Sequence, residues 1–391
     1  MNASFDVVIV GGGVTGAAVG YGLAKRGVKT CLVDAVPTFS RASRANMGLI
    51  WCQSKALGCP QFVRWGFASS RAYGNLAAEL KELSGIDTGY APTGGIIPCL
   101  GEAELEARAQ FIEKLRAETE DGTYPASVLS RKELEGMLPK VPFGPDVSGG
   151  IWSDMDGYVD PLHLMFAFRK SFVRLGGTLF AGERVSEVKP SGKGYTLVCG
   201  GRTLECGKVV LAAGLGVRKL AAQLGTDIPV FPNKSQVMLL ERIPADVLPI
   251  PLLGIARTFG GTVMIGAAHE NMGMDRRLTP EVLAANAQWA VRVWPELERK
   301  RILRFWTGMR VWPKDAYPIY DRIPGHENAF VFAMHSAVSL AAILEQALPD
   351  YVMGKPLPPD GAIFGLSRFA GGGSGFQGSA ASSPHAEAPN K

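Results

Sequence analysis

The sequence predicts an α/β fold in which a parallel sheet is interrupted by a second, largely antiparallel part. Three observations predict it. An apolar strand, a glycine turn, a helix and a second strand follow one another over residues 6–34. A second buried strand that runs into glycines lies at residues 208–216, and the chain between residues 230 and 323 is mostly strand-like. Because a strand, a helix and a further strand in this order form a βαβ unit, the first two observations belong to one parallel sheet.

The opening unit carries the glycine pattern of a dinucleotide-binding turn. Residues 7–10 are apolar, and Gly11, Gly13 and Gly16 follow them with the spacing G-x-G-x-x-G. The first glycine permits a tight turn, the second lets backbone N–H groups approach a pyrophosphate, and the third brings helix and strand together. Asp34 follows Gly16 by eighteen residues, near the spacing of a carboxylate that binds an adenosine ribose. A glycine-rich turn without a ligand is the alternative, and the unit alone does not separate NAD from FAD.

Composition excludes several classes of function. The chain is 47% hydrophobic and 20% charged, which is typical of a globular protein with one large or two interleaved domains. The net charge of +5 comes without a polybasic cluster, so we expect no nucleic-acid partner. The six cysteines contain no C-x-x-C pair, which indicates reduced thiols, no metal site and a cytoplasmic location. We also expect no signal peptide and no transmembrane segment.

The next part of the chain is expected to be a loop followed by inserted helices. Residues 37–48 are mostly small or polar and contain two arginines, which predicts a loop that returns toward the glycine turn. Helical periodicity covers residues 60–83 and 102–116, and a β-like run at 94–98 separates them. This region therefore interrupts the parallel sheet.

The pattern of the opening unit resumes after the insertion. Residues 160–175 predict a helix, and short strands near 185–188, 195–198 and 203–206 predict a meander that leads into the strand and glycine turn at 208–216. The two glycine-ended strands are nearly two hundred residues apart. The first domain is therefore interrupted by its own insertions, which is more typical of FAD-binding than of NAD-binding domains.

The last third of the chain is expected to supply the remaining strands and helices of both the parallel sheet and the strand-rich part. Residues 230–323 are mostly strands, with one amphipathic helix near 280–293. A strand at 329–334 precedes a helix at 337–347, which Pro349 is expected to end. The expected parts are an FAD-binding domain (1–60, 150–228 and 326–368), a substrate domain (61–149 and 229–325) and a disordered tail rich in Gly, Ser, Ala and Pro (369–391).

Four further runs carry a family resemblance: RASRANMGL (41–49), DGYVDP (156–161), VVLAAG (209–214) and WTGMRVWPKDAYPI (306–319). Together with the glycine turn, and in this order, they resemble the D-amino acid oxidase and glycine oxidase superfamily over residues 5 to about 366. The resemblance implies a discontinuous Rossmann-type domain that binds FAD without a covalent bond. It also implies an interleaved α+β substrate domain on a mixed, largely antiparallel sheet.

Two runs narrow the resemblance. SRANMGLIWCQSK (43–55) and AMHSAVSLAA (333–342) look most like β subunits of dye-linked dehydrogenases. That group includes opine oxidase, hydroxyproline or proline dehydrogenase and cyanide-forming glycine dehydrogenase. The resemblance implies a hetero-oligomer, with FMN or iron–sulfur groups only in companion subunits, and any contact with a membrane would come through those partners.

The resemblance also implies catalytic positions. Arg310 falls in the strand that carries the family's substrate-binding arginine and would hold a substrate carboxylate, although an ion pair with Asp315 or Asp321 is the alternative. His335 lies where backbone N–H groups would approach the flavin. His269 is expected to line the substrate pocket together with Glu270, although such a pair is more often found on the surface.

The remaining candidate residues are expected to contact the cofactor. Ser336 is also a plausible helix N-cap. The alternative for the two loop arginines is that they belong to a basic loop exposed to solvent. The family usually has glycine at or beside the position of Ala337. The complete expected set is Gly11, Gly13, Val14, Thr15, Gly16, Asp34, Arg41, Ser43, Arg44, Asn46, Met47, Gly48, Leu49, Val185, Ala213, Gly214, Arg310, His335, Ser336, Ala337 and Val338.

Two absences favour a dehydrogenase over an oxidase. Monomeric sarcosine oxidases tether their flavin through a cysteine in the segment that corresponds to 304–323, and they use a lysine near the strand at 264–269, but this chain has neither. The sequence therefore leaves three hypotheses: a dehydrogenase subunit that oxidises an amino acid or secondary amine, a stand-alone oxidase that produces hydrogen peroxide, and a flavin-bearing subunit without catalysis of its own. The substrate, its stereochemistry and the electron acceptor do not follow from the sequence.

Overall fold

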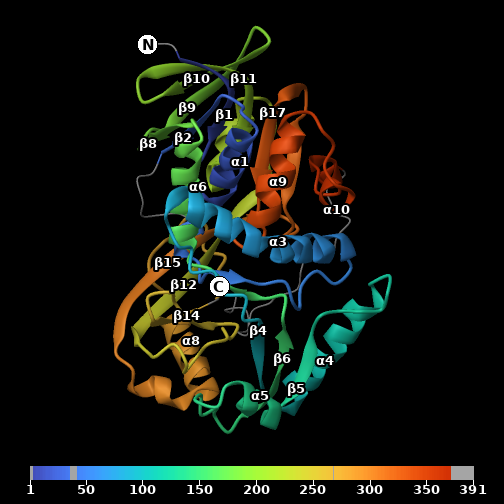
Figure 1. Ribbon diagram of the computed structural model, residues 1–391, viewed down its shortest axis with the longest axis vertical. Helices are drawn as coiled ribbons and strands as arrows, with labels where there is room; N and C mark the ends of the chain where they lie inside the picture. Colours follow the sequence, from blue (N-terminus) through green and yellow to red (C-terminus); the bar gives the residue numbers. More distant parts are fainter. Residues whose placement is uncertain (1–2, 36–41, 267, 371–391) are drawn as a thin grey trace.

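The computed structural model describes residues 3–35, 42–266 and 268–370. Arg41 and most of the segment 369–391, which the sequence predicts to be disordered, lie outside the described residues. The chain forms two parts, seen above and below helix α3 (Pro60–Ser84) in Figure 1. Each of the two parts has its own sheet.

The upper part contains the predicted parallel sheet. Strand β1 (Ala3–Val10) pairs in parallel with β2 (Thr30–Asp34) on one side and with β11 (Arg202–Leu211) on the other. The register places Val8 opposite Val209, so the two glycine-ended strands, which were predicted to share one sheet, are neighbours in it. The full order is β16-β17-β11-β1-β2-β8, with β17 at His326–Ala333, β16 at Ile319–Ile323 and β8 at Thr178–Ala181. The strand at the β16 edge is antiparallel to β17.

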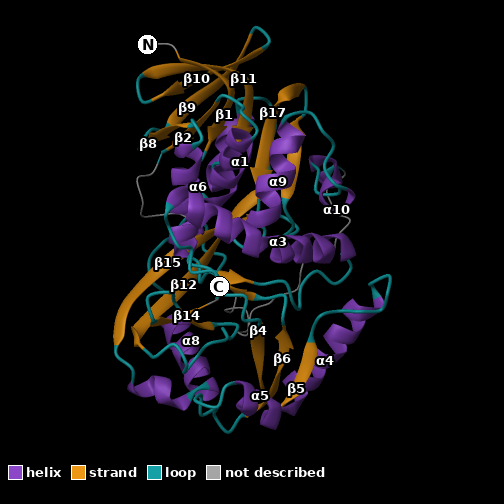
Figure 2. Cartoon of the chain, viewed as in Figure 1, coloured by secondary structure: helices purple, strands orange, loops and turns teal. Residues whose placement is uncertain are grey.

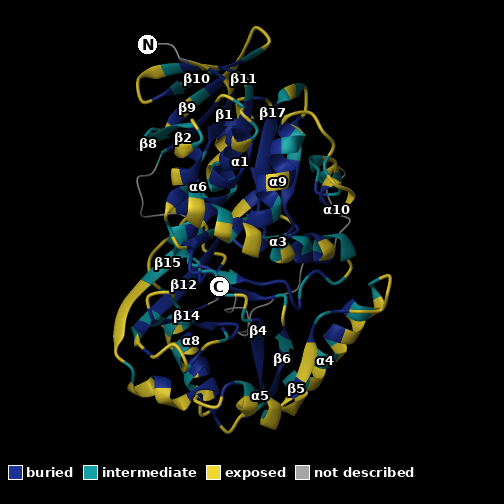
Figure 3. Cartoon of the chain, in the orientation of Figure 1, coloured by how far each residue is buried: buried dark blue, intermediate teal, exposed yellow. Residues whose placement is uncertain are grey.

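Helices cover one face of this sheet, and a meander extends from its other side. Helix α1 (Val14–Lys25) packs between α6 (Pro161–Arg174) and α9 (Ala341–Val352). The predicted meander is formed by β9 (Val185–Ser191), β10 (Gly194–Cys199) and the start of β11. Figure 2 shows the helices in front of the sheet, and Figure 3 shows the strands buried beneath them. The strands of the parallel sheet are apolar along most of their length because both faces are covered.

The lower part is built from antiparallel strands. Its four-stranded sheet has the order β13-β14-β12-β15 and its three-stranded sheet has the order β4-β6-β5. Helix α8 (Pro280–Val293) packs on the first sheet, as the amphipathic pattern predicts. The strands are β12 (Val230–Arg242), β13 (Ile255–Arg257), β14 (Thr262–Gly266), β15 (Ile302–Pro313), β4 (Gly95–Leu100), β5 (Ser127–Ser130) and β6 (Val147–Ser153).

The remaining elements are short or lie between the sheets. A two-stranded ribbon joins β3 (Leu49–Ile50) to β7 (Gly157–Tyr158). The other helices are α2 (Ala42–Ala45), α4 (Glu102–Ala117), α5 (Arg131–Met137), α7 (Val217–Ala222) and α10 (Pro359–Ala362), and short 3-10 turns occupy Gly214–Gly216, Pro295–Arg299 and Leu366–Phe369. The mixed α/β architecture confirms the predicted fold class.

The bounds predicted for the helix at 337–347 are wrong at both ends. Residues 337–340 form a turn, and α9 begins at Ala341 with Leu340 as its N-cap. It then continues through Pro349 to Val352. Pro349 withholds one N–H group from the helix, but the apolar packing of α9 against α1 outweighs that loss.

Candidate functional site

A large cavity joins the two parts of the molecule. Its volume is about 810 Å³, near the upper end of the ~300–1,000 Å³ typical of small-molecule sites. It begins where the parallel strands β1, β2 and β11 end and reaches the antiparallel strands β12 and β15. The carboxyl ends of parallel strands are the usual place for a ligand in an open α/β sheet.

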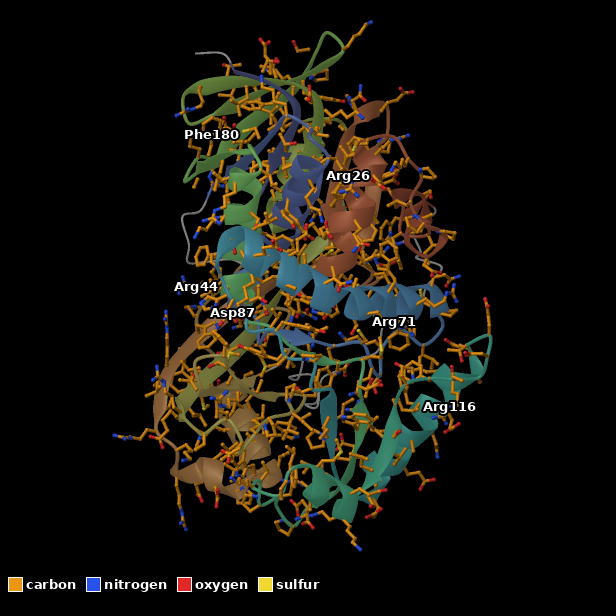
Figure 4. All side chains as sticks on the ribbon, viewed as in Figure 1. Arg26, Arg44, Arg71, Asp87, Arg116 and Phe180 are labelled. Atoms are coloured by element: carbon orange, nitrogen blue, oxygen red, sulfur yellow. The ribbon has the colours of Figure 1, made fainter. Side chains whose placement is uncertain are left out.

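Most of the residues predicted from the sequence line this cavity. Those that do so are Gly11, Gly13, Val14, Thr15, Asp34, Ser43, Asn46, Met47, Leu49, Val185, Ala213, Gly214, His269, Arg310, His335, Ser336, Ala337 and Val338. Gly16, Arg44 and Gly48 do not line it, and Arg44 lies at the left margin of the molecule in Figure 4. The structure therefore brings together residues from both ends of the chain.

The glycine turn has the close contacts that its pattern predicts. Gly11 has a φ of +107°, and a Cβ atom there would lie 2.4 Å from the carbonyl oxygen of Ala212. A Cβ atom on Gly16 would lie 1.8 Å from the carbonyl oxygen of Gly11. Helix α1 therefore starts against the strand, and its N-terminus, where Gly13 has no side chain to act as a cap, faces the cavity. The partial positive charge of that helix end favours a phosphate group there.

The loop after β2 supports this turn. The backbone N–H of Val14 donates to Ser43 Oγ over 3.0 Å. Asn46 stabilises the loop itself, because its Nδ2 donates to the carbonyl oxygen of Ser43 over 2.8 Å and its Oδ1 accepts from the N–H of Gly48. Gly48 has a φ of +74°, and a Cβ atom there would meet the carbonyl oxygen of Val159 at 2.1 Å. Gly48 thus shapes the loop without lining the cavity.

Asp34 has a partner that the sequence analysis missed. Its carboxylate forms a buried ion pair with Arg169, from helix α6. Arg169 also donates from Nε to the carbonyl oxygen of Gly12 over 2.9 Å. A Cβ atom on Gly12 would lie 2.5 Å from both the guanidinium and the carboxylate, so the middle glycine is needed as well. A charged residue within the apolar face of the helix at 160–175 is the signal that would have identified Arg169.

Arg310 points into the opposite end of the cavity from the glycine turn. Its Nη1 donates to Asn233 Oδ1 (3.0 Å) and to the carbonyl oxygen of Ala268 (2.8 Å), and its Nη2 donates to Ser235 Oγ (2.9 Å). Burial lowers the pKa of Arg310 to about 10, which still leaves the guanidinium charged at neutral pH. Within the described part of the chain, no carboxylate lies at ion-pair distance from it.

The alternative ion pairs for Arg310 are wrong. Asp315 pairs instead with Arg368 at 2.7 Å, and Asp321 accepts a hydrogen bond from the N–H of Leu366 at 2.6 Å. Arg310 is half-buried, and a cation largely removed from water without an acidic partner is unfavourable, so Arg310 gains from an anionic ligand.

Two neutral imidazoles flank Arg310. Trp312 contacts both His269 and His335, with ring centroids 5.2 Å and 4.7 Å apart. Burial lowers the pKa of His269 to about 3, with a further contribution from the charge of Arg310. Burial also lowers the pKa of His335 well below its ordinary value. These rings can position a ligand, but neither carries a positive charge at neutral pH.

The turn after His335 differs from the predicted cap. Ser336 has a φ of +64°, and its hydroxyl lies 3.0 Å from Nδ1 of His335. Its carbonyl oxygen accepts from the N–H of Leu340, and this bond closes the turn that precedes α9. Ser336 is therefore part of the cavity wall and is not the N-cap of the helix.

A buried polar network lies behind Arg310. Lys234 forms an ion pair with Glu270, with 3.1 Å between Nζ and Oε2, and both side chains are almost inaccessible. Gln236 Nε2 donates to the other carboxylate oxygen over 2.8 Å, and Lys234 Nζ donates to Thr279 Oγ1 over the same distance. Glu270 therefore does not line the cavity beside His269 as expected. Instead it fixes the segment that carries His269 to strand β12.

The low pKa of His269 predicts an acid-dependent loss of stability. Between about pH 3 and pH 6.5 the unfolded chain binds a proton at this residue and the folded chain does not, so stability falls as the pH falls. Relative to His269→Gln, the wild type should lose about 1.4 kcal/mol of unfolding free energy per pH unit between pH 6 and pH 4. Chemical denaturation of both proteins at several pH values measures this difference. A difference that stays constant over the range would show that His269 titrates normally in the folded chain.

Neither a cluster of metal-binding side chains nor a membrane-spanning helix is found in the described part of the chain. No group of three or more His, Cys, Asp or Glu side chains there has an arrangement suited to a metal ion. None of the described helices is long and apolar enough to cross a membrane. All six cysteines are described, and each is a buried free thiol.

Comparisons with known proteins agree with this geometry. Residues 6–344 match the DAO family, described as FAD dependent oxidoreductase. A subunit of opine oxidase from Rhizobium meliloti is 34% identical over 365 residues, which cover 93% of this chain and 97% of the relative. The crystal structure of glycine oxidase from Geobacillus kaustophilus superposes with a TM-score of 0.86 at 28% identity, over 94% of this chain and 99% of that one. L-proline dehydrogenase from P. horikoshii, at 20% identity and a TM-score of 0.81, shares the fold over 94% of this chain and 98% of its own.

Proposed function

The chain belongs to the DAO family of FAD-dependent oxidoreductases, and on that basis we propose that it oxidises the C–N bond of an amino acid or secondary amine. The substrate is of the opine, proline or hydroxyproline, or glycine type. The observation that carries the proposal is the cavity itself. It starts at a glycine turn suited to a phosphate and ends at Arg310, a half-buried cation that has no ion-pair partner among the described residues.

The residues present fit FAD. The N-terminus of α1 suits the pyrophosphate, and Asp34, supported by Arg169, suits the adenosine ribose. Val185 and Gly214 line the same end of the cavity, where the adenine would lie. Met47 and the turn at residues 335–338 line the part nearer Arg310 and would hold the flavin. When bound, FAD supplies the acceptor for a hydride from the carbon that carries the substrate nitrogen.

The side chains around Arg310 orient the substrate. A carboxylate can accept two parallel N–H bonds from the guanidinium, whose plane is set by Asn233 and Ser235. With the carboxylate held, the adjacent C–H bond has fewer orientations in the cavity. The neutral ring of His335 sits beside this position without repelling a substrate ammonium group. The amine must lose its proton to react, and the nearby positive charge of Arg310 favours the neutral form of the amine.

We further propose that the electrons pass to companion subunits or to another acceptor in place of oxygen. Two relatives have names that describe them as parts of a larger enzyme: the opine oxidase relative from Rhizobium meliloti, and HcnC of Pseudomonas aeruginosa, a subunit of hydrogen cyanide synthase. The likeness to glycine oxidase favours the alternative, in which the isolated chain reduces oxygen to hydrogen peroxide. We also propose that the protein is cytoplasmic and that it is divided into the FAD-binding and substrate domains expected from the sequence.

A reoxidation experiment distinguishes these acceptors. The purified holoprotein is reduced without oxygen by a substrate that bleaches its flavin, and is then mixed either with air-saturated buffer or with an artificial dye acceptor. We expect rapid reoxidation by the dye and slow reoxidation by oxygen, with little hydrogen peroxide. Fast reoxidation in air, with one peroxide formed for each reduced flavin, would instead establish the oxidase.

A further inference from the structure

A second cation lines the same end of the cavity as Arg310. Lys55 lies in the segment after β3 and lines the cavity together with Trp51, Ser336 and Ser339. Protein surrounds it on every side, and yet it keeps some accessible surface because it faces the cavity.

The backbone around Lys55 is strained in a way that fixes the direction of its side chain. Ser54 and Ala56, on either side of it, have φ values of +54° and +63°, which are unfavourable for residues other than glycine. Backbone strain of this kind persists only where the surrounding structure enforces it, and it gathers at functional sites.

The surrounding structure does enforce this conformation. Asp156 Oδ1 accepts from the N–H groups of Cys52 and Gln53, over 2.6 Å and 3.2 Å. The side chain of Gln53 donates to the carbonyl oxygen of Gly95 over 2.8 Å. The N–H of Ser54 donates to the hydroxyl of Tyr124 over 3.1 Å. The loop is therefore held rigidly by buried groups from the lower part of the molecule.

The ammonium group of Lys55 has more hydrogen-bond donors than the described residues use. Its Nζ makes one hydrogen bond, to the carbonyl oxygen of Trp51 at 2.9 Å, whereas an ammonium group has three donors. Among the described residues, no carboxylate lies within 4.0 Å of it. Burial lowers the pKa of the Lys55 ammonium group, and the Cys52 thiol and the Asp156 carboxyl oppose that effect. Burial in turn raises the pKa of Asp156 to about 7, so the nearby protein supplies little negative charge and an anionic ligand would favour the charged form of Lys55.

The carboxylates of the cavity are unevenly distributed, and the cations that line it are Lys55, Arg184, Lys219, Arg276 and Arg310. The carboxylates that line it are Asp34 and Glu183, and both lie at the end of the glycine turn. At the other end, His335 experiences the charges of both Arg310 and Lys55, which places it within reach of the two cations. Arg310 comes from strand β15 and Lys55 from the loop after β3, so the cations approach from different elements.

We infer that Lys55 is a second anion-binding residue, and that the preferred substrate is a secondary amine with two carboxylates, one held by Arg310 and the other by Lys55. This inference rests on the proposed function and specifies its substrate class. A substituted amine whose nitrogen joins two carboxylate-bearing carbons would place its C–N bond between the two cations. An amino acid with one carboxylate would use Arg310 alone.

Binding of unreactive analogues tests this inference. Thiodiacetate has two carboxylates and (methylthio)acetate has one, and neither contains a C–N bond that can be oxidised. Their dissociation constants are measured from the change in flavin absorbance of the wild type, Lys55→Met, Lys55→Arg and a control, Lys140→Met, which removes an exposed lysine of the lower part. Lys55→Met should weaken thiodiacetate binding about 10- to 100-fold, in line with the loss of a charged hydrogen bond, and should leave (methylthio)acetate within about threefold. Lys55→Arg should restore most of the thiodiacetate affinity.

The KM values of the wild type and Lys55→Met are then compared for iminodiacetate, which has two carboxylates, and for sarcosine, which has one. Lys55→Met should raise KM for iminodiacetate and leave that for sarcosine unchanged. An equal loss for both analogues, or a change only in the rate of reoxidation by oxygen, would overturn the inference. If no amine reduces the flavin, the proposed function fails, but the binding titration still decides whether Lys55 holds an anion.

Discussion

Replacing Arg310 with methionine is expected to lower kcat/KM for a carboxylate-bearing amine by about 100- to 1,000-fold, the effect of losing a bidentate, charge-assisted pair. The structure gives the reason. Arg310 Nη1 and Nη2 are oriented by Asn233 and Ser235, and no described carboxylate competes for the guanidinium. Steady-state kinetics with an artificial acceptor measures the loss.

Two comparisons separate a role in binding from a role in folding. Arg310→Lys keeps the charge but not the planar fork, so we expect an intermediate loss. Arg310→Met removes the hydrogen bonds to Asn233, Ala268 and Ser235 together with the charge, so Tm and flavin content are measured beside kcat/KM, and a loss of kcat/KM at full flavin content reports on substrate binding. An exposed arginine on helix α8, Arg292, supplies the control Arg292→Met. Wild-type kcat/KM in Arg310→Met would show that the carboxylate is held elsewhere.

Replacing Gly16 with alanine is expected to abolish nearly all FAD binding. The new Cβ atom would lie 1.8 Å from the carbonyl oxygen of Gly11, so helix α1 would have to move by about 1.5 Å to reach an ordinary contact. That movement displaces the N–H groups that face the pyrophosphate. The ratio of flavin absorbance to protein absorbance in the purified variant measures the bound cofactor, and circular dichroism reports whether the chain is folded.

Gly20 provides a matched control in the same helix. A Cβ atom there would lie 3.4 Å from Ile9 Cδ1, which is close to an ordinary contact. Gly20→Ala should therefore keep its flavin, and its Tm should change little, because alanine favours the helix. Full flavin content in Gly16→Ala, with an intact fold, would contradict the assigned role of the glycine turn.

The parts of the fold that were predicted correctly depend on local patterns. The strand, glycine turn and helix at residues 6–25 lie together in the sequence, so periodicity and spacing identify them. Strand β6 (Val147–Ser153) was missed because it contains Gly149 and Gly150, which weaken a strand signal. Those glycines are required by packing, since a Cβ atom on Gly149 would lie 2.2 Å from the carbonyl oxygen of Leu129.

The site was predicted less completely because its contacts join distant parts of the chain. Asp34 and Arg169 are 135 residues apart, and nothing in the sequence near either one indicates the other. Lys55 and Arg310 reach one cavity only because the loop at Lys55 is held by Asp156 and Tyr124. The family resemblance indicated Arg310, but it offered no distances from which the second cation follows.

We propose that this chain oxidises an amine whose carboxylate is held by Arg310. The most direct test is flavin reduction without oxygen, in which the wild type and Arg310→Met are mixed with octopine, iminodiacetate, D- and L-proline, hydroxyproline, glycine and sarcosine. We predict that at least one of these compounds bleaches the oxidised flavin band of the wild type, and that the same concentration leaves the variant oxidised. A wild-type flavin that no compound reduces, or equal bleaching in both proteins, would contradict the claim.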